Sequence, residues 1–362
     1  MGFRRFELSE VFDDYRMLYA RAGNAATPFC GFDYFNEKLF AGDFSVLKNR
    51  CDTKVYGWFR NSKPKLLVSH YTLKREGLTQ ESSLGAILVD PSLAPSEMEQ
   101  FLAELKGQLQ PWSGKTVAPL NGHMSLGFAL PAAYVDGEKI GFFTTSQSLL
   151  MQSFFADAEA FKIARHYFAF QRVVDAEFHL RLQQEIADMP SRLSVRPISR
   201  LHFKRDVEIY NQLLNRCMEG HPGFYPLTVE EEWDLMQKSL PLILPEYFQF
   251  LLYNGIEVGF CFALPDFNSL MRNGADLRNA VQVLTRKKSV QRARIMYTGL
   301  LPHFQGRGWF KYVRHRVLLA MIQNGVKEIE SSYIDEDNAR TLGTVRSSGA
   351  QTSHEFLLYS MV

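Results

Sequence analysis

The residues with the clearest chemical potential lie late in the chain, in a glycine-rich turn from Gln305 to Phe310. The turn reads Gln-Gly-Arg-Gly-Trp-Phe and follows an apolar segment that ends at Pro302, and a helix-period run from Phe310 to Ile322 comes after it. A glycine turn that opens a helix lets backbone N–H groups converge on an anion, and the helix dipole adds about half a positive charge there. Arg307 supplies a cation in addition. The turn therefore predicts an anion site of the kind that holds a pyrophosphate, although a tight strand-to-helix connection also uses glycines.

Three titratable side chains lie on the segments that flank this turn. Tyr297 stands on the strand that leads into the turn, and Glu330 and Tyr333 stand on the strand expected after the helix. A carboxylate can accept a proton through one water at neutral pH, so Glu330 is the better general base if it faces the site. A tyrosine in a strand is more often a packing residue. We take Glu330, Tyr297 and Tyr333 as the candidate catalytic residues.

A second group of polar residues flanks a predicted hairpin upstream of the turn. Its members are Glu219, His221, Tyr225, Asp266 and Asn268. Each also has a plain reading as a solvated or turn-forming side chain. We take them as the candidate substrate-binding residues.

Two hairpins organise the elements around these residues. The stronger signal is Asn254-Gly255 between the β-rich runs 247–253 and 256–264, because Asn-Gly supplies the positive φ angles of a type I′ turn. The earlier hairpin joins 54–60 to 65–71 through residues 61–64.

The same order of elements follows each hairpin. A strand that ends near a proline (84–89 and 293–300) precedes an amphipathic helix (96–110 and 308–323) and a further strand (116–120 and 326–333). The repetition predicts an α/β (α+β) fold of two related halves, each with a mixed, mostly antiparallel sheet flanked by helices. We place the domains at 1–190 and 191–362.

Composition excludes several classes of protein. The chain has 362 residues, of which 46% are hydrophobic and 22% charged, which is typical of a globular protein with two domains. Lys and Arg number 41 against 39 Asp and Glu, so the net charge of +2 gives no reason to expect DNA as a partner. The basic run 286–288 reads as a solvated loop.

The cysteines and the absence of long apolar segments indicate a compartment. The four cysteines (Cys30, Cys51, Cys217 and Cys261) are far apart and form no C-x-x-C pair, which fits buried thiols better than disulfides or a metal site. No apolar run reaches the roughly 18 residues that a membrane span needs. The N-terminus lacks an apolar signal core. We therefore expect a cytoplasmic protein without a bound metal.

The arrangement around the turn resembles that of the GNAT superfamily of acyl-CoA N-acyltransferases. The resemblance rests on Pro302, on Gln305 with Gly308 three residues later, on the flanking strands, and on Asn338. It extends over about residues 195–361, and the layout as a whole is similar to tandem members whose N-terminal domain is degenerate. The first half carries Asp90-Pro-Ser-Leu-Ala-Pro95 at the corresponding turn, and without glycines its backbone cannot approach a pyrophosphate.

The resemblance implies a set of cofactor-binding residues and a reaction. An acyl-CoA, either acetyl-CoA or a longer-chain form, would place its pyrophosphate on the loop, while Leu300 and Leu301 pair with the pantetheine arm and Asn338 lies near that arm. A main-chain N–H near Leu300 or Leu301 would stabilise the oxyanion. The implied loop residues are Gln305, Gly306, Arg307, Gly308, Trp309 and Phe310. The implied acceptor is a small primary amine or an amino-acid-like molecule.

The sequence departs from the family pattern at three positions. Phe310 occupies the last small-residue position of the loop, and Val345 stands seven residues after Asn338, where many members have a tyrosine acid. Arg294 stands where histone-directed members have a glutamate base. Two alternatives therefore stay open beside N-acyl transfer from acyl-CoA: a donor carried by an acyl carrier protein or aminoacyl-tRNA, and a non-catalytic module that binds acyl-CoA or a partner.

Overall fold

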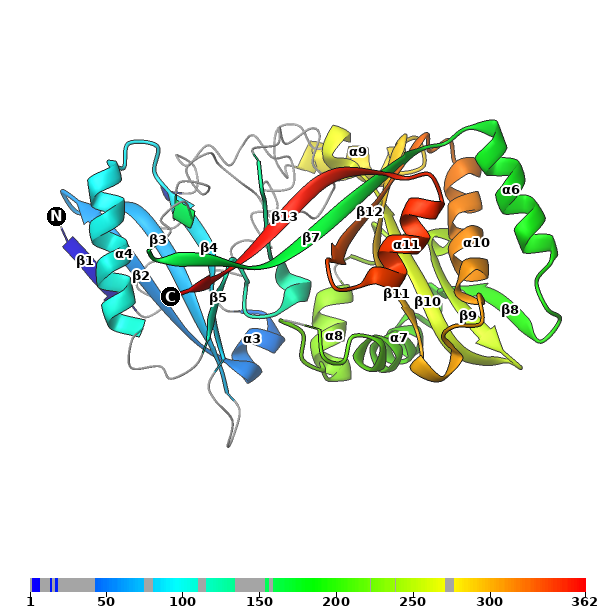
Figure 1. Cartoon of the computed structure of the whole chain (residues 1–362), viewed down its shortest axis with the longest axis horizontal. Coiled ribbons are helices and arrows are strands. Elements are labelled where there is room, and N and C mark those ends of the chain that lie inside the picture. Colours follow the sequence, from blue (N-terminus) through cyan, green and yellow to red (C-terminus); the bar gives the residue numbers. More distant parts are fainter. Residues whose placement is uncertain are drawn as a thin grey trace. The chain divides into compact units, whose positions relative to one another are not determined.

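The computed structural model describes residues 2–6, 14, 17, 18, 43–74, 81–109, 115–133, 154, 155, 159–221, 223–237, 239–270 and 277–362 (Figure 1). These residues form two compact units. Unit 1 lies within Met1–Tyr167 and His354–Val362, and unit 2 within Phe168–Leu270 and Leu277–Ser353.

Unit 1 is built on a mostly antiparallel sheet. Its strand order is β1-β2-β3-β4-β5-β13-β7, and only β4 and β5 are recorded as a parallel pair. The strands are β1 (Gly2–Phe6), β2 (Cys51–Arg60), β3 (Lys63–Leu73), β4 (Ser82–Val89), β5 (Thr116–Ala118), the first half of β7 (Phe161–Val173) and most of β13 (Gln351–Met361), with β6 (Leu130–Pro131) paired to β13.

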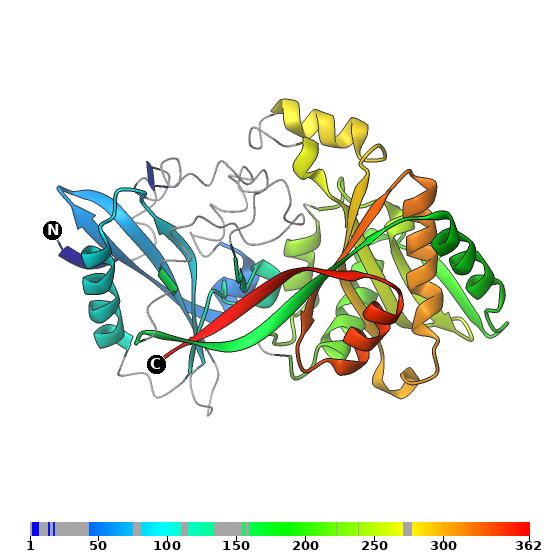
Figure 2. The same cartoon turned by 45° about the horizontal axis from the view of Figure 1, so that its top comes forward.

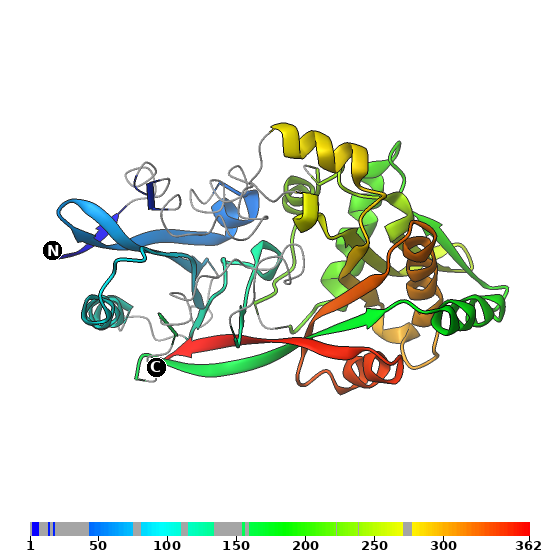
Figure 3. The same ribbon diagram turned by 90° about the horizontal axis from the view of Figure 1, so that it is seen from above.

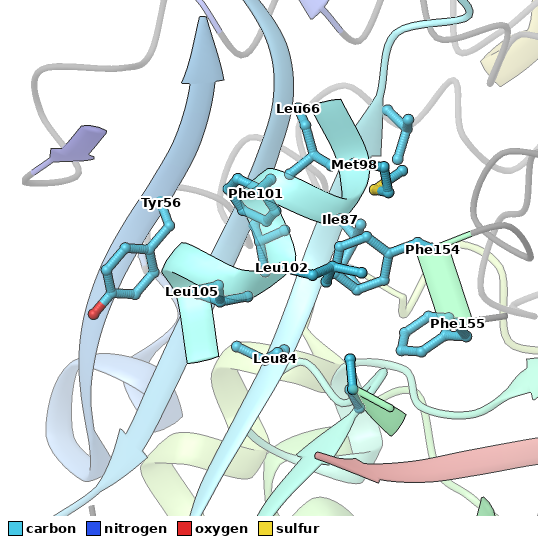
Figure 4. Packing of buried hydrophobic residues seen from close by; sticks show 14 of the residues in the cluster. Tyr56, Leu66, Leu84, Ile87, Met98, Phe101, Leu102, Leu105, Phe154 and Phe155 are labelled. Carbon is cyan, nitrogen blue, oxygen red and sulfur yellow. The ribbon is translucent and has the colours of Figure 1, made fainter. Parts of the chain in front are cut away.

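One helix covers the core of unit 1. In α4 (Pro95–Leu109) the residues Phe101, Leu102 and Leu105 recur at helical spacing and are at most 2% exposed. They pack against strand residues such as Leu84 in a single apolar cluster (Figure 4). Burial of this stripe is what fixes the helix on the sheet.

Unit 2 repeats this plan, with more helices among the described residues. Its strand order is β8-β9-β10-β11-β12-β7, with β11 and β12 parallel and the other recorded pairs antiparallel. The strands are β8 (Leu193–Pro197), β9 (Phe248–Tyr253), β10 (Ile256–Pro265), β11 (Arg292–Leu300) and β12 (Glu328–Asp335). The helices are α6 (Ala176–Ala187), α7 (Phe203–Cys217), α8 (Val229–Met236), α9 (Leu277–Arg286), α10 (Phe310–Gln323) and α11 (Ala339–Ser347).

The two faces of the unit 2 sheet are covered by different helices. Val313, Val317 and Met321 of α10 are fully buried and share a cluster with Ala293 and Ile329 of the sheet, and α6 lies beside α10 (Figure 1 and Figure 2). Because strand side chains alternate between faces, the neighbours of Ala293 and Ile329 point to the opposite face, against which α7 packs. Arg294 and Glu330, the neighbours of Ala293 and Ile329, lie on the face opposite α10.

Both predicted hairpins are confirmed. Asn254 and Gly255 have φ angles of 49° and 81° between β9 and β10, as a type I′ turn requires. Asn61 and Ser62, with φ angles of 52° and 60°, join β2 to β3. The predicted repetition of strand, helix and strand after each hairpin is also present, and the mixed α/β fold with a mostly antiparallel sheet is confirmed.

The compact units divide between Tyr167 and Phe168, whereas the pattern of the sequence placed a boundary near residue 190. Two strands account for the position of this division. The second half of β7 joins unit 2, where β7 is the neighbour of β12, and β13 returns to unit 1, where Tyr359 pairs with Ala118 of β5. In unit 1, β13 and the first half of β7 run side by side (Figure 3).

Candidate functional site

The strands β11 and β12 of unit 2 part from each other halfway along. Their parallel pairing runs from Arg292 opposite Glu328 to Ile295 opposite Ser331, and among the residues that the structure describes no further rung is recorded between them. At the same point Met296 is an extra residue relative to β10, since Tyr297 lies opposite Phe262 and Ile295 opposite Ala263. A bulge of this kind bends a strand and changes the direction of its side chains. The result is a gap inside the sheet, bordered by the second half of β11.

The main chain of β11 presents one edge to this gap. The N–H of Leu301 donates to the carbonyl of Val258 at 2.9 Å, so this amide points toward β10. Amides alternate in direction along a strand, so the N–H of Leu300 points the other way, toward the gap. Of the two amides named from the sequence, Leu300 has the suitable direction and Leu301 is already bonded.

The glycine-rich turn follows β11 directly. A short 3₁₀ turn (Pro302–Phe304) leads into it, Gly306 and Gly308 have φ angles of 78° and 71°, and α10 begins at Phe310. A side chain with Cβ is strained at such angles, so the turn depends on its glycines. Phe310 occupies the first helical position with a half-buried ring that packs with the α10 core, which is how the turn accommodates the bulky residue.

Gln305 holds the turn in place. Its Nε2 donates to the carbonyl of Leu300 at 2.9 Å, and its Oε1 accepts from Nη1 of Arg340, on α11, at 3.2 Å. One side chain thus connects the end of β11, the turn and α11. Asn338 begins α11, and its Oδ1 accepts from the backbone of Thr341 at 3.1 Å.

The N-terminus of α10 has backbone N–H groups that the described residues do not bond. Within the described part of the chain, the backbone N–H groups from Gly306 to Phe310 have no recorded acceptor, and no side chain caps the helix. The first turn carries no acidic residue. It carries Lys311, whose Nζ lies 3.7 Å from Oε2 of Glu185 on α6, and the guanidinium of Arg307 lies 5.0 Å from the ring of Trp309, which is 5% exposed. Helix N-terminal amides without a recorded acceptor, next to two cations, are the features of a phosphate site.

A pocket whose lining includes Gln212, Arg216 and Glu257 beside apolar residues lies next to the beginning of this turn. Its volume is about 310 Å³. α7 contributes Ile209 and Leu213, β10 contributes Val258, and the segment after β11 contributes Leu301 and Phe304. The strand end before the turn therefore borders a pocket that α7 also lines.

Glu330 lies on the α7 face, in an ion pair. Its Oε1 is 3.1 Å from Nε of Arg294, and the two side chains are 3% and 2% exposed. The guanidinium of Arg294 also lies 5.1 Å from the ring centre of Tyr333. The structure thus brings Glu330 and Tyr333 together around Arg294, near the last rung between β11 and β12.

Asp266 and Asn268 belong to the same polar cluster. Asp266 lies 3.5 Å from Arg292, its Oδ1 accepts from the backbone of Asn268 at 3.0 Å, and Arg292 also lies 3.8 Å from Glu330. Burial raises the pKa of Asp266 to about 6, and Arg292 opposes this rise. These candidate substrate-binding residues therefore lie near the candidate base.

The remaining sequence candidates lie apart from that cluster or on the other side of the bulge. Glu219 is exposed and His221 half-buried in the turn after α7, while Tyr225 is buried ahead of α8. Neither Glu219 nor His221 has a recorded contact with the cluster. Tyr297 follows the bulge and lies close enough to Tyr210 of α7 that its charge affects the pKa of Tyr210.

Sequence reasoning missed a buried carboxylate on α8, Glu232. It follows a capping box in which Thr228 and Glu231 bond each other's backbone, and it is 3% exposed. Burial raises the pKa of Glu232 to about 7, and a hydrogen bond with Asn211 opposes the rise. The signal was present in the sequence: Glu232 stands four residues before the buried Met236, so both lie on the inward face of the helix.

The corresponding positions of unit 1 are filled by the chain itself. Beside β4, where Ala86 forms a bulge with a φ of 45°, Asn121 accepts from the N–H of Ala86 at 2.9 Å, and Leu120 donates to the carbonyl of Leu84 at 2.8 Å. At the start of α4, Oε2 of Glu97 accepts from the N–H of Ala94 at 3.0 Å. The gap and the helix N-terminus are thus both occupied.

Two general properties complete the description. Among the residues that the structure describes, no group of three or more His, Cys, Asp and Glu side chains is placed to hold a metal ion. None of the described helices is long and apolar enough to cross a membrane.

Comparison with known proteins identifies the fold. No model of a known protein family matches the sequence, and no curated protein sequence matches it. Among solved structures, a tandem GNAT protein from the clavulanic acid biosynthesis pathway is 11% identical, with 99% of this chain and 97% of that chain covered and a TM-score of 0.56. A glucosamine N-acetyltransferase region of a fungal multi-domain β-N-acetylglucosaminidase is 12% identical, with 99% of this chain and 38% of that chain covered and a TM-score of 0.51. The chain has the tandem GNAT fold, as the resemblance of its sequence implied.

Proposed function

We propose that the protein is an N-acyltransferase that binds acyl-CoA in unit 2 and transfers the acyl group to a primary amine. One observation carries the proposal: the free amides from Gly306 to Phe310, flanked by Arg307 and Lys311, lie at the end of a strand whose inner edge borders a gap. A pyrophosphate would accept from the amides of the turn, and the extended pantetheine arm would pair with the edge of β11. The fold supports this proposal, because solved structures with the same architecture include acetyltransferases.

The residues of the gap have separate roles in this proposal. The main chain of Leu300 hydrogen-bonds the pantetheine arm, and Gln305 keeps the strand end and the turn in register. The acceptor amine approaches from the α7 face, where Tyr297, Tyr333, Glu330, Asp266 and Asn268 lie. Placing amine and thioester next to each other lowers the barrier by several kcal/mol without covalent catalysis.

The reaction itself is a direct displacement. The amine nitrogen attacks the thioester carbonyl, a C–N bond forms, the C–S bond breaks, and CoA leaves as the thiol after taking a proton. A main-chain N–H that points into the gap stabilises the oxyanion. The amine must reach the carbonyl unprotonated, so a group that takes its proton is needed.

Release of CoA thiol tests the proposal. The full chain is incubated with acetyl-CoA or a longer acyl-CoA and a panel of primary amines and amino acids, and free thiol and amide product are both measured. We expect thiol release that depends on an amine, with one amide formed for each thiol. Binding of CoA without release for any donor and amine would contradict catalysis and favour a binding module. Release only from an acyl carrier protein or aminoacyl-tRNA would contradict CoA as the donor.

A further inference from the structure

We propose that Arg192, in the segment between α6 and β8, recognises the 3′-phosphate of CoA together with Arg307 of the glycine turn. The inference rests on the proposed binding of acyl-CoA to unit 2 and adds a specificity-determining residue to that site. It also narrows the donor to free acyl-CoA, because a pantetheine arm attached to a carrier protein has a single phosphate and no adenosine.

Three aromatic rings, those of Trp309, Tyr253 and Phe304, form a platform at the glycine turn. Trp309 is 5% exposed, and its ring stacks on that of Tyr253 with 5.1 Å between the ring centres and 19° between the planes. The ring of Phe304 lies 6.1 Å from that of Trp309 and 5.5 Å from that of Tyr253. Rings packed in this way are held rigidly, so they give fixed positions to the groups that lie over them.

The guanidinium groups of two arginines lie over this platform. That of Arg192 is 5.1 Å from the ring centre of Trp309 and 5.8 Å from that of Tyr253, and that of Arg307 is 5.0 Å from the ring centre of Trp309. Cations are attracted to aromatic rings at these distances. Because one indole ring holds both arginines, their charges lie no farther apart than the sum of the two distances from it. Both side chains are exposed, so a phosphate placed between them can reach both guanidinium groups.

The main chain around Arg192 is fixed to two neighbouring elements. The carbonyl of Arg192 accepts from the N–H of Asn254, in the turn between β9 and β10, at 2.9 Å. Four residues earlier, the carbonyl of Asp188 accepts from the hydroxyl of Tyr312 on α10 at 3.2 Å. The segment that carries Arg192 is therefore held beside the helix whose N-terminus forms the proposed pyrophosphate site.

The cations around the turn differ in their partners. Lys311 lies 3.7 Å from Oε2 of Glu185, so its charge already has a counter-ion. For Arg192 and Arg307, by contrast, no ion pair or side-chain hydrogen bond is recorded with any residue that the structure describes, and the ring of Trp309 is their shared contact. Two like charges close together repel each other, and an anion between them removes this repulsion. The two arginines are therefore suited to an anionic ligand group.

The chemistry of CoA supplies two kinds of phosphate to this region. Its diphosphate suits the row of backbone amides at the start of α10. Its 3′-phosphate is a monoester with a second pKa of about 6, so it is mostly a dianion at neutral pH. A dianion pairs best with two guanidinium groups, each of which can donate two parallel hydrogen bonds. The amides thus take the diphosphate, and Arg192 and Arg307 take the 3′-phosphate.

Two ligands and two variants test the assignment. Dephospho-CoA differs from CoA only by the missing 3′-phosphate, so the ratio of the two affinities measures how strongly that group is recognised. Arg192→Gln removes the proposed contact. Arg316→Gln is the matched control, because it removes one exposed positive charge from α10. Calorimetric titration of the full chain at one fixed, low salt concentration gives each affinity.

We expect the wild type to bind CoA about 30-fold more tightly than dephospho-CoA. Arg192→Gln should lower the affinity for CoA about 10-fold and leave that for dephospho-CoA unchanged, which also shows that the variant is folded. Arg316→Gln should change neither affinity.

Three results would overturn the assignment: equal affinities of the wild type for the two ligands, an equal loss of both in Arg192→Gln, or a loss in Arg316→Gln as large as in Arg192→Gln. The first two leave the proposed function intact, because CoA is still bound. A wild type that binds neither ligand would instead contradict the proposed function, and the role of Arg192 with it.

Discussion

The helices α4 and α10 occupy the same place in the two units and have opposite electrostatics at their N-termini. At α4, Glu97 bonds the N–H of Ala94 and pairs with Arg60, and Asp90 accepts from the N–H of Ser92 at 2.9 Å. At α10, the first turn has no acid, and the amides from Gly306 onward have no recorded acceptor in the described chain. Unit 1 thus places carboxylates on the amides at its helix start, whereas in unit 2 the recorded carboxylate, Glu185, lies against the Lys311 side chain and not on the amides.

The gap beside β4 in unit 1 is closed by hydrogen bonds from the chain, and the described residues do not close the gap beside β11 in unit 2. In unit 1 the parallel pairing of β4 and β5 stops at Ser83 opposite Val117, and Leu120 and Asn121 then bond the exposed edge of β4. In unit 2 the corresponding edge of β11 has no recorded rung to β12 beyond Ile295. The same fold is therefore closed by its own chain in unit 1 and open at the corresponding place in unit 2. The difference lies in a few side chains.

Reversal of charge at the α10 N-terminus should have the largest effect. Arg307→Glu combined with Lys311→Glu gives the end of α10 the acidic character of α4, and we expect CoA affinity to fall by more than about 100-fold, about 3 kcal/mol. The control is Arg316→Glu, an exposed position on the same helix. Binding is measured by calorimetry at low salt. Equal losses in both proteins would mean that net charge, and not the N-terminus of α10, determines affinity.

Removal of the Asn121 side chain, which bonds the edge of β4 in unit 1, should destabilise the protein without creating a second CoA site. Asn121→Ala deletes the bonds to Ala86 N and, at 2.8 Å, to the Leu126 carbonyl, and leaving these buried groups unpaired costs about 2 kcal/mol. Denaturant unfolding measures the loss. CoA stoichiometry should stay at one, since Glu97 and Asp90 still fill the helix end. A second CoA bound to this variant would refute the view that those carboxylates close unit 1.

A glycine substitution should separate backbone strain from ligand contact. Gly308→Ala and Gly325→Ala place Cβ at φ angles of 71° and 83°, and neither Cβ meets an atom within 4 Å. Both should therefore lose similar stability, about 1 kcal/mol. Only Gly308→Ala should weaken CoA binding, by about 10-fold, because Gly325 lies at the far end of α10. Similar CoA affinities for the two variants would place the ligand elsewhere.

The smallest effect should come from the internal anion of unit 1. Arg60 is the first cause that holds the pKa of Glu97 at about 2, with the N–H of Ala94 and Trp58 contributing. Because the pKa of Glu97 is lower in the folded protein, its carboxylate stabilises the fold at pH values above the ordinary pKa of a glutamate. This contribution is lost as the pH falls toward 2. Glu97→Gln should therefore lower Tm by about 2 to 4 °C at pH 7 and by less at pH 3. A loss of Tm that is equal at both pH values would mean that the charge of Glu97 does not stabilise α4.

The sequence predicted the features that depend on local chemistry. The Asn-Gly turn, the glycine turn after Pro302 and the missing glycines at 90–95 all follow from backbone preferences, and the repeated order of elements followed from periodicity. The face of Glu330 was not predictable, because it depends on the rung that joins Arg294 to Glu330, and that rung is set by tertiary register. The same holds for Asn121, which reaches Ala86 from 35 residues away, and for β13, which pairs in unit 1. Glu232 was overlooked because its neighbours on α7 were unknown.

Calorimetric titration of the full chain with CoA tests the central claim most directly. We predict one CoA bound per chain, with affinity lowered more than about 100-fold by the double charge reversal at Arg307 and Lys311 and unaffected by Glu97→Gln. No binding at millimolar CoA, or two CoA molecules per chain, would contradict the account in which unit 2 is open to the ligand and unit 1 is closed.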